Sequence, residues 1–254
     1  MLLQALLVTL LAATPLHFAR KTKDAEVSLK LPASVAHAPV LHDRLYRGEV
    51  KGLTKFVADA ASGRRDEPKA FRELGAWEDQ IDYALTLETP RLMGLRREEY
   101  VDTHGAHPNH PSGGIVFDKA TNTRVRALDL LRPGADIKTL DRALCDAARA
   151  AKRERADGDW NEKEDTNFSC PTWRGLYLNG KLLQGGDPVQ FTLAPGTVKD
   201  RAGGLIFVYS PYELGAYVEG GYDLVLPLAV LRDALKPEYA GEFAGSPKPL
   251  PKES

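Results

Sequence analysis

The stretch Gln80-Ile81-Asp82-Tyr83-Ala84-Leu85-Thr86-Leu87-Glu88 decides the fold class of this 254-residue chain. Polar and apolar residues alternate along it, and this period of two predicts a strand with one buried face. The residues expected on that face are Ile81, Tyr83, Leu85 and Leu87. After a short polar break, residues 92–102 have the composition of a second strand, which we expect to be its antiparallel neighbour.

Outward from this pair, the pattern predicts more short strands and a few helices. Strands are predicted at 26–31, 189–193, 204–209 and 222–227, and hairpins at 114–128 and around Asn179-Gly180. Helices are predicted at 42–61, 136–155 and 228–235. Strands and helices that are segregated in this way favour an α+β fold, with antiparallel sheets and a few packed helices, over a doubly wound parallel sheet.

Composition and element order divide the chain into four parts. Hydrophobic residues make up 43% and charged residues 27%, which is enough for packed cores without structural metals. We expect two consecutive small α+β domains at 24–160 and 165–240. Residues 1–19 are expected to be a signal peptide, and the Pro- and Gly-containing residues 241–254 a flexible tail.

The N-terminus has the character of a targeting segment. Residues 2–11 are apolar apart from Gln4 and Thr9, a run too short to span a bilayer, which takes about 20 apolar residues. It fits the apolar region of a secretory signal that ends at Ala13 or Ala19, although no Lys or Arg precedes it. We therefore expect a periplasmic protein whose mature chain has no transmembrane segment; a buried N-terminal helix is the alternative.

The charge of the chain bears on its partners, and its cysteine content bears on crosslinks and metal sites. The chain has 34 basic and 35 acidic residues and a net charge of −1, so nothing in its charge points to nucleic acid. It has two cysteines, Cys145 and Cys170. In an exported chain such a pair predicts a disulfide, whereas two free buried thiols are the alternative in a reducing compartment. The pair lacks the close spacing of zinc ligands.

Three histidines raise the question of metal chemistry. His104, His107 and His110 recur every third residue, and imidazole is a common metal ligand. One hypothesis is therefore a metal-dependent envelope enzyme or metal-binding protein centred on this loop. The loop is rich in Gly and Pro, however, and it lacks the helical HExxH pattern that places two rings on one face. We assign no metal ligand, cofactor or catalytic residue, because no nucleophile elbow or phosphate loop is present either.

Tyrosines form the other distinctive feature. Tyr209, Tyr212, Tyr217 and Tyr222 lie within 14 residues of each other. Tyrosine combines a large apolar ring with a polar tip and is favoured at binding surfaces. Tyr209 and Tyr222 fall in predicted strands and also suit a core. Tyr212 and Tyr217 fall in a predicted loop and are the better surface candidates.

Two motifs resemble known domains. Residues 100–109, Tyr-Val-Asp-Thr-His-Gly-Ala-His-Pro-Asn, together with 115–118 and 128–131, resemble the domain that precedes the catalytic part of PdaC-type peptidoglycan deacetylases. The core of that domain is a Gly-Gly-Ala-His turn; here His104 replaces the first Gly, and Leu131 replaces a final Phe. Residues 207–220 resemble its companion C-terminal domain, with a YE…Y…G signature. In this order the two resemble the extracellular part of RsiV-type anti-sigma factors, which bind lysozyme.

The resemblance implies an exported, non-catalytic envelope binding protein over residues 26–240, with lysozyme or peptidoglycan as its partner. The deacetylase metal motifs and the anti-sigma region have no counterpart in the matching stretches. Lysozyme is strongly basic, so a surface that binds it is expected to carry acidic anchors. The expected binding residues are Gly105, Ala106, His107, Tyr209, Pro211, Tyr212, Glu213, Tyr217 and Glu219. A structural envelope protein without a small ligand is a further alternative.

Overall fold

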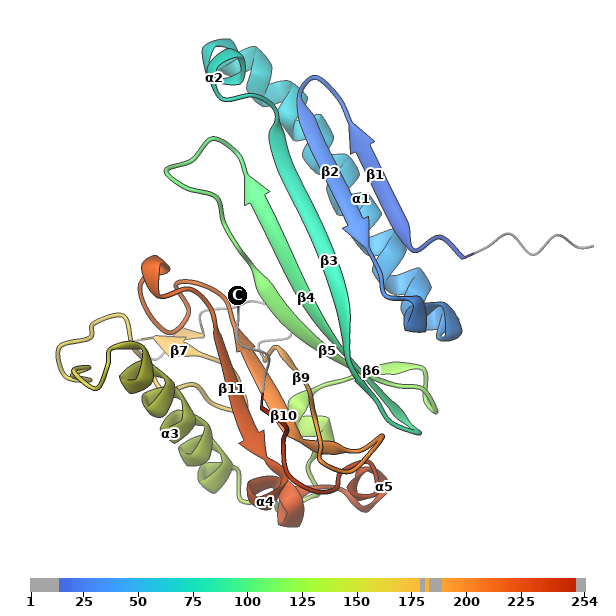
Figure 1. The fold of residues 1–254 in the computed structure, drawn as a ribbon, viewed down its shortest axis with the longest axis vertical. Coiled ribbons are helices and arrows are strands. Elements are labelled where there is room, and N and C mark those ends of the chain that lie inside the picture. Colours follow the sequence, from blue (N-terminus) through green and yellow to red (C-terminus); the bar gives the residue numbers. More distant parts are fainter. Residues whose placement is uncertain (1–13, 179–180, 183–188, 250–254) are drawn as a thin grey trace, which may run out of the picture.

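The computed structural model describes residues 14–178, 181–182 and 189–249 (Figure 1). A six-stranded sheet has the order β1-β2-β3-β4-β5-β6. Its strands are β1 (His17–Lys21), β2 (Ala25–Lys30), β3 (Trp77–Glu88), β4 (Leu92–Asp102), β5 (Ser112–Asp118) and β6 (Thr123–Val125). A three-stranded sheet has the order β11-β10-β9, formed by β9 (Phe191–Pro195), β10 (Ala202–Tyr209) and β11 (Tyr222–Pro227). The predicted α+β class is confirmed.

Helices cover the two sheets separately. The α-helices are α1 (Pro39–Asp66), α2 (Pro68–Glu73), α3 (Ile137–Arg155), α4 (Leu228–Leu231) and α5 (Pro237–Ala240). Short 3₁₀ turns lie at Ala33–His37, Ala127–Leu130, Tyr217–Glu219 and Arg232–Ala234. Figure 1 shows α1 along β1–β3 and α3 along β11. The helix predicted at 42–61 extends further at both ends and begins at Pro39, a residue that suits a first turn. The exposed Gly48 and Gly52 do not interrupt it.

The large sheet is mixed rather than fully antiparallel. β2 and β3 pair in parallel, and the chain between them forms α1. The pairs β1–β2, β3–β4, β4–β5 and β5–β6 are antiparallel, as the prediction for 80–88 and 92–102 requires. The expectation of antiparallel sheets is therefore wrong for β2–β3, since a helical crossover returns the chain in the same direction.

A bulge corrects the predicted face of β3. Ile81 and Tyr83 are buried against α1, as expected. The register of β3 against β4 then shifts between Leu85 and Leu87. Leu85 is consequently 40% exposed, and Leu87 packs against the core on the opposite side of the sheet. The four residues predicted to share one face are divided by this extra residue.

Two cores share the six-stranded sheet. On one face Met93, Leu95 and Phe117 pack with α1. On the other face Leu92 and Val116 join a core built from the three-stranded sheet and α3. That second core runs from β4 to Phe243 and so includes residues on both sides of the predicted boundary between 160 and 165. The division into two domains stays a prediction.

Glycines let the sheets approach each other. A Cβ at Gly94 of β4 would lie 2.7 Å from the hydroxyl oxygens of both Thr86 and Thr192. A Cβ at Gly114 of β5 would overlap the backbone of Phe191 in β9. Both glycines are therefore needed where β9 passes over β4 and β5, because a larger side chain would hold the three-stranded sheet away.

The ends of the chain differ from expectation. Residues 17–19 of the predicted signal peptide lie in β1, paired with β2. The flexible tail predicted at 241–254 is folded over 241–249: Phe243 is buried, and the Glu242 carboxylate accepts a hydrogen bond from the Arg91 amide at 3.0 Å. The burial of Phe243 and the hydrogen bond to Glu242 order this segment despite its loop-like composition. Residues 250–254 lie outside the described residues.

Two other expectations concern the hairpin around residues 179–180 and the absence of a transmembrane segment. The turn residues Asn179 and Gly180 lie outside the described residues, but the strands beside them, β7 (Tyr177–Leu178) and β8 (Lys181–Leu182), pair antiparallel. Across residues 14–178, 181–182 and 189–249, no helix combines the length and apolarity that crossing a bilayer requires.

The close approach at Gly114 predicts an asymmetry between two glycine substitutions. Gly114→Ala is expected to destabilise the fold by about 3 kcal/mol, because the added methyl group meets backbone that cannot rotate away. Gly48→Ala in α1, where a Cβ has open space, is expected to raise stability by about 0.5–1 kcal/mol. Urea unfolding of both variants measures this difference, and equal stabilities would contradict the packing described.

Candidate functional site

The structure brings the His107 loop and the tyrosine loop together. The His107 ring stacks on the Tyr217 ring with centroids 3.7 Å apart, and its Nε2 lies 2.9 Å from the Tyr212 hydroxyl. The Tyr217 hydroxyl donates to the carbonyl of Pro108 at 2.6 Å. These contacts join positions more than 100 residues apart in the sequence into one surface. We call His107, Tyr212 and Tyr217 the aromatic cluster.

Backbone conformation presents one member of the cluster to solvent. Tyr212 is 60% exposed and has φ +73°, a left-handed conformation that a tyrosine rarely adopts. Strain of this kind is often found at functional sites, where the surroundings hold it in place. Val218, at the tip of the same loop, is 91% exposed. The loop therefore offers two apolar side chains to a partner.

The other two histidines have different neighbours. His104 packs edge-on against Phe71, with centroids 4.8 Å apart, and its backbone amide donates to Asp102 at 2.9 Å. His110 packs against Tyr100 at 5.4 Å. Among the residues that the structure describes, no group of three His, Cys, Asp or Glu side chains is placed to hold a metal ion. The metal hypothesis finds no support in this arrangement.

The remaining predicted binding residues have mixed positions. Gly105 and Ala106 are exposed beside the aromatic cluster, and Pro211 lines an adjacent groove. Tyr209 is buried in the core of the three-stranded sheet, so its expected place at the surface is wrong. Every residue of β10 is buried, since Tyr209 joins one core cluster and Val208 another, whereas Tyr212 in the loop that follows is exposed.

The two predicted acidic anchors are engaged internally. The Glu213 carboxylate accepts the Ser210 amide at 2.6 Å, and burial raises its pKa. Glu219 accepts the Ala216 amide at 2.8 Å and pairs with Lys152 at 2.6 Å. Burial alone would raise the pKa of Glu219, but the hydrogen bond from Lys152 and others outweigh it and lower the pKa. Neither carboxylate is a free surface charge.

A buried lysine organises the loop that carries Tyr217. The Lys152 side chain, 2% exposed, lies 2.7 Å from Asp165 and 2.6 Å from Glu219. Arg155, one turn further along α3, donates to the carbonyls of Glu219 and Gly221. The end of α3 therefore fixes the loop 216–221 through two cations. We call Lys152, Asp165 and Glu219 the ion triad.

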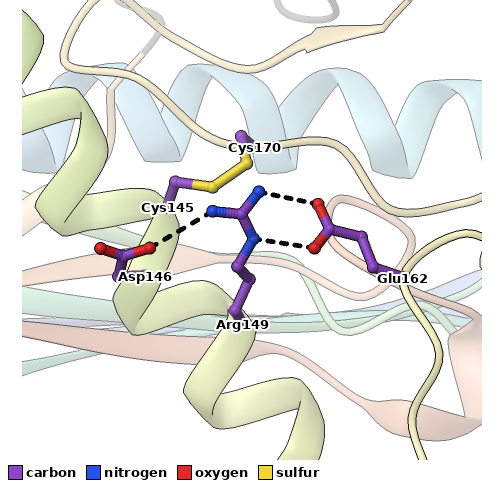
Figure 2. Close-up of a disulfide and its surroundings, with 5 residues drawn as sticks. All are labelled: Cys145, Asp146, Arg149, Glu162 and Cys170. Atoms are coloured by element: carbon purple, nitrogen blue, oxygen red, sulfur yellow. Dashed lines mark hydrogen bonds and ion pairs between the residues drawn. A yellow bond between two sulfur atoms is a disulfide. The ribbon is translucent and has the colours of Figure 1, made fainter.

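The predicted disulfide is present on the same helix, about two turns before Lys152. Figure 2 shows Cys145 on α3 joined to Cys170, with a Cα–Cα distance of 4.9 Å. Beside it, Arg149 donates to both carboxylate oxygens of Glu162, at 2.8 and 2.9 Å. The bridge, this ion pair and Asp165 attach the segment 156–171 to α3. Closing a loop of 25 residues contributes about 3 kcal/mol in the chain-entropy model.

A groove of about 1100 Å³ adjoins the aromatic cluster. Its lining comes from the polar face of β3 and β4, from the three-stranded sheet, from the end of α3 and from the loop 211–221. Tyr217 and His110 belong to its rim. Sequence reasoning missed the groove and the ion triad. A lysine within the apolar stripe of α3, at position 152, was the one local signal of the triad.

A second cluster of titratable groups lies under α1. Asp79 is 7% exposed, and the carboxylates Glu49 and Glu99 share a single guanidinium, that of Arg97, at 3.1 and 2.6 Å. The Tyr83 hydroxyl donates to Glu49 at 2.6 Å. Burial, followed by the charge of Glu99, raises the pKa of Asp79 to about 7. This cluster is part of the core between α1 and the sheet.

Comparison with known proteins identifies the fold. No family model and no curated protein matches the chain. A solved structure of a DUF3298 family protein from Pseudomonas aeruginosa is 17% identical, covers 90% of this chain and 94% of its own, and has a TM-score of 0.57. A member of the same family from Bacteroides fragilis is 12% identical, covers 86% and 87%, and has a TM-score of 0.56.

At these identities the similarity defines an α+β fold of the DUF3298 type over most of the chain. The similarity shows the fold, and the resemblance of the two motifs to PdaC-type and RsiV-type domains stays a prediction.

Replacing the buried lysine should destabilise the protein. Lys152→Met leaves Asp165 and Glu219 without their common cation, and we expect a loss of about 3–5 kcal/mol. Lys138→Met, on an exposed position of the same helix, should change stability by less than about 0.5 kcal/mol. Thermal and urea unfolding compare the two. A similar small effect for both would show that the ion triad does not hold the loop.

The raised pKa of Asp79 predicts a pH dependence. The folded chain holds this proton until about pH 7, whereas the unfolded chain releases it near 3.8. Stability from this group is therefore complete below about pH 4 and falls as the pH rises to 7, by up to roughly 4 kcal/mol. Asp79→Asn should flatten that decline. Urea unfolding at pH values from 4 to 8 measures it, and parallel profiles would contradict the assignment.

Proposed function

We propose that this chain is an exported, non-catalytic envelope protein that binds peptidoglycan through the aromatic cluster. The observation that carries the proposal is the meeting of His107, Tyr212 and Tyr217 beside a large groove. Tyr212 offers an exposed ring in a strained but supported conformation, and tyrosine rings contribute contact area at little entropic cost. The two loops that form this surface are the ones whose sequences resemble PdaC-type and RsiV-type domains.

Among the two partners that the resemblance implies, the geometry favours peptidoglycan over lysozyme. A binder of the basic lysozyme is expected to present free carboxylates. Glu213 caps its own loop, and Glu219 belongs to the ion triad, so the carboxylates expected to serve as anchors are already used. A groove beside aromatic rings instead suits an extended chain. Lysozyme is therefore the alternative partner, which a binding experiment distinguishes from peptidoglycan.

Export is part of the proposal. A disulfide persists in oxidising compartments such as the periplasm. Between the two candidate cleavage positions, Ala13 leaves β1 whole, whereas Ala19 would remove three of its five residues. We infer processing at Ala13, with β1 retained in the mature chain. Cell fractionation followed by N-terminal sequencing tests this, and recovery from the cytoplasm alone would overturn it.

Sedimentation with insoluble peptidoglycan sacculi tests the binding function. The chain is expected to sediment with them, and Tyr212→Ala should weaken this by about tenfold, because truncating an exposed aromatic anchor removes about 1–2 kcal/mol of contact. Leu74→Ala is the control, since Leu74 is 64% exposed but lies at the end of α2. It should bind as the unchanged chain does.

Three results would contradict the proposal. The chain could fail to sediment with sacculi at micromolar concentration. Tyr212→Ala and Leu74→Ala could bind alike, which would place the contact elsewhere. A chain that is retained on immobilised lysozyme but not on sacculi would identify lysozyme as the partner, and it would require acidic residues other than Glu213 and Glu219.

A further inference from the structure

We propose that the groove beside the aromatic cluster is a binding site for an uncharged oligosaccharide of two or more rings. This inference rests on the proposed function and deepens it, because it assigns a ligand class and a second set of residues to the same surface. The residues that line the groove include Thr86 and Thr192, Arg96 and Asp223, and Tyr217.

The size of the groove selects for a ligand larger than one ring. Pockets that hold drug-sized molecules have volumes of about 300–1,000 Å³. This groove measures about 1100 Å³ and collects residues from β3, β4, the three-stranded sheet and α3. A single sugar or amino acid would leave most of its wall uncovered. An oligosaccharide would reach from the central strands to the rim.

Charge argues against an ionic ligand. The lining carries the cations Arg96 and Arg155 and the carboxylates Glu98, Glu154 and Asp223, so neither sign dominates. A site for phosphate or nucleic acid would be basic, and a site for a polycation would be acidic. Arg96 is paired with Glu98 and Asp223, so its positive charge is compensated within the groove, while carboxylate lone pairs that the ion pairs leave unused can accept from the hydroxyl and amide groups of a neutral glycan.

The charged walls are fixed before a ligand arrives. Arg96 of β4 bridges to Asp223 of β11 and also pairs with Glu98, so one guanidinium connects the two sheets. Between the sheets, the hydroxyl groups of Thr86 and Thr192 lie 2.7 Å apart. Groups that are already oriented lose little freedom on binding, which favours affinity.

The rim is fixed in the same way. The Arg155 guanidinium lies 3.8 Å from the centroid of the Tyr222 ring and donates to the carbonyls of Glu219 and Gly221. Tyr217 lies on the same loop, and its ring is held by stacking on the His107 ring. An aromatic ring at the edge of a polar groove supplies an apolar face for the C–H side of a sugar ring.

Titration with a defined oligosaccharide tests the inference. The probe is the β-1,4-linked tetramer of N-acetylglucosamine, with the glucosamine tetramer, which carries amines, as the charged comparison. Ala151 on α3 lines the groove and Ala150 beside it is exposed and outside the lining, so the pair provides matched variants. We expect calorimetry to show that Ala151→Phe weakens binding of the neutral tetramer at least tenfold, that Ala150→Phe leaves it unchanged, and that the glucosamine tetramer binds more weakly.

NMR gives a readout that does not depend on the folding of a variant. In the unchanged chain, the backbone amides of Gly220 and Gly221, at the groove rim, are expected to shift on addition of the neutral tetramer. Equal binding of the tetramer to Ala151→Phe and Ala150→Phe, or shifts confined to residues outside the groove, would overturn the proposed site. Tighter binding of the glucosamine tetramer would overturn the ligand class.

The two proposals fail in different ways. Sedimentation with sacculi without measurable binding of the neutral tetramer would overturn the groove site and leave the envelope binding function standing. Absence of sedimentation together with groove binding of the tetramer would overturn the peptidoglycan function alone.

Discussion

The direct contact between β9 and the strands β4 and β5 sets how the two sheets pack on each other. It exists because Gly94 and Gly114 have no side chain where Thr192 and Phe191 cross. The contact brings the three-stranded sheet onto the lower part of the large sheet in Figure 1 and closes the second core around Leu92 and Val116. The groove beside this contact is lined from both sheets, by Thr86 and Arg96 of the large sheet and by Thr192, Ile206 and Asp223 of the small one.

The loop that carries Tyr217 depends on a different kind of interaction. A buried lysine is tolerated only where carboxylates surround it, and Lys152 has Asp165 and Glu219. Asp165 lies on the segment that the Cys145–Cys170 bridge ties to α3, and Glu219 lies on the 3₁₀ turn with Tyr217. The disulfide and the aromatic cluster are therefore both connected to α3, the first through Cys145 and the second through the ion pair of Lys152 with Glu219.

This arrangement explains why two separate sequence motifs form one surface. The His107 loop connects β4 to β5, and the tyrosine loop connects β10 to β11. The crossing of the sheets brings the two connections side by side, and the ion triad holds the second loop at the height where Tyr217 stacks on His107. The aromatic cluster and the groove are consequences of the same packing rather than independent features.

Local periodicity was enough to predict several elements of the fold. Alternation predicted the strand around Ile81, the apolar stripe predicted α3, and the two cysteines predicted the Cys145–Cys170 disulfide for an exported chain. Only tertiary packing decided the bulge after Leu85, the burial of Phe243, and the inward engagement of the predicted anchors Glu213 and Glu219. These outcomes depend on contacts between distant segments, such as Lys152 with Glu219, which no local pattern records.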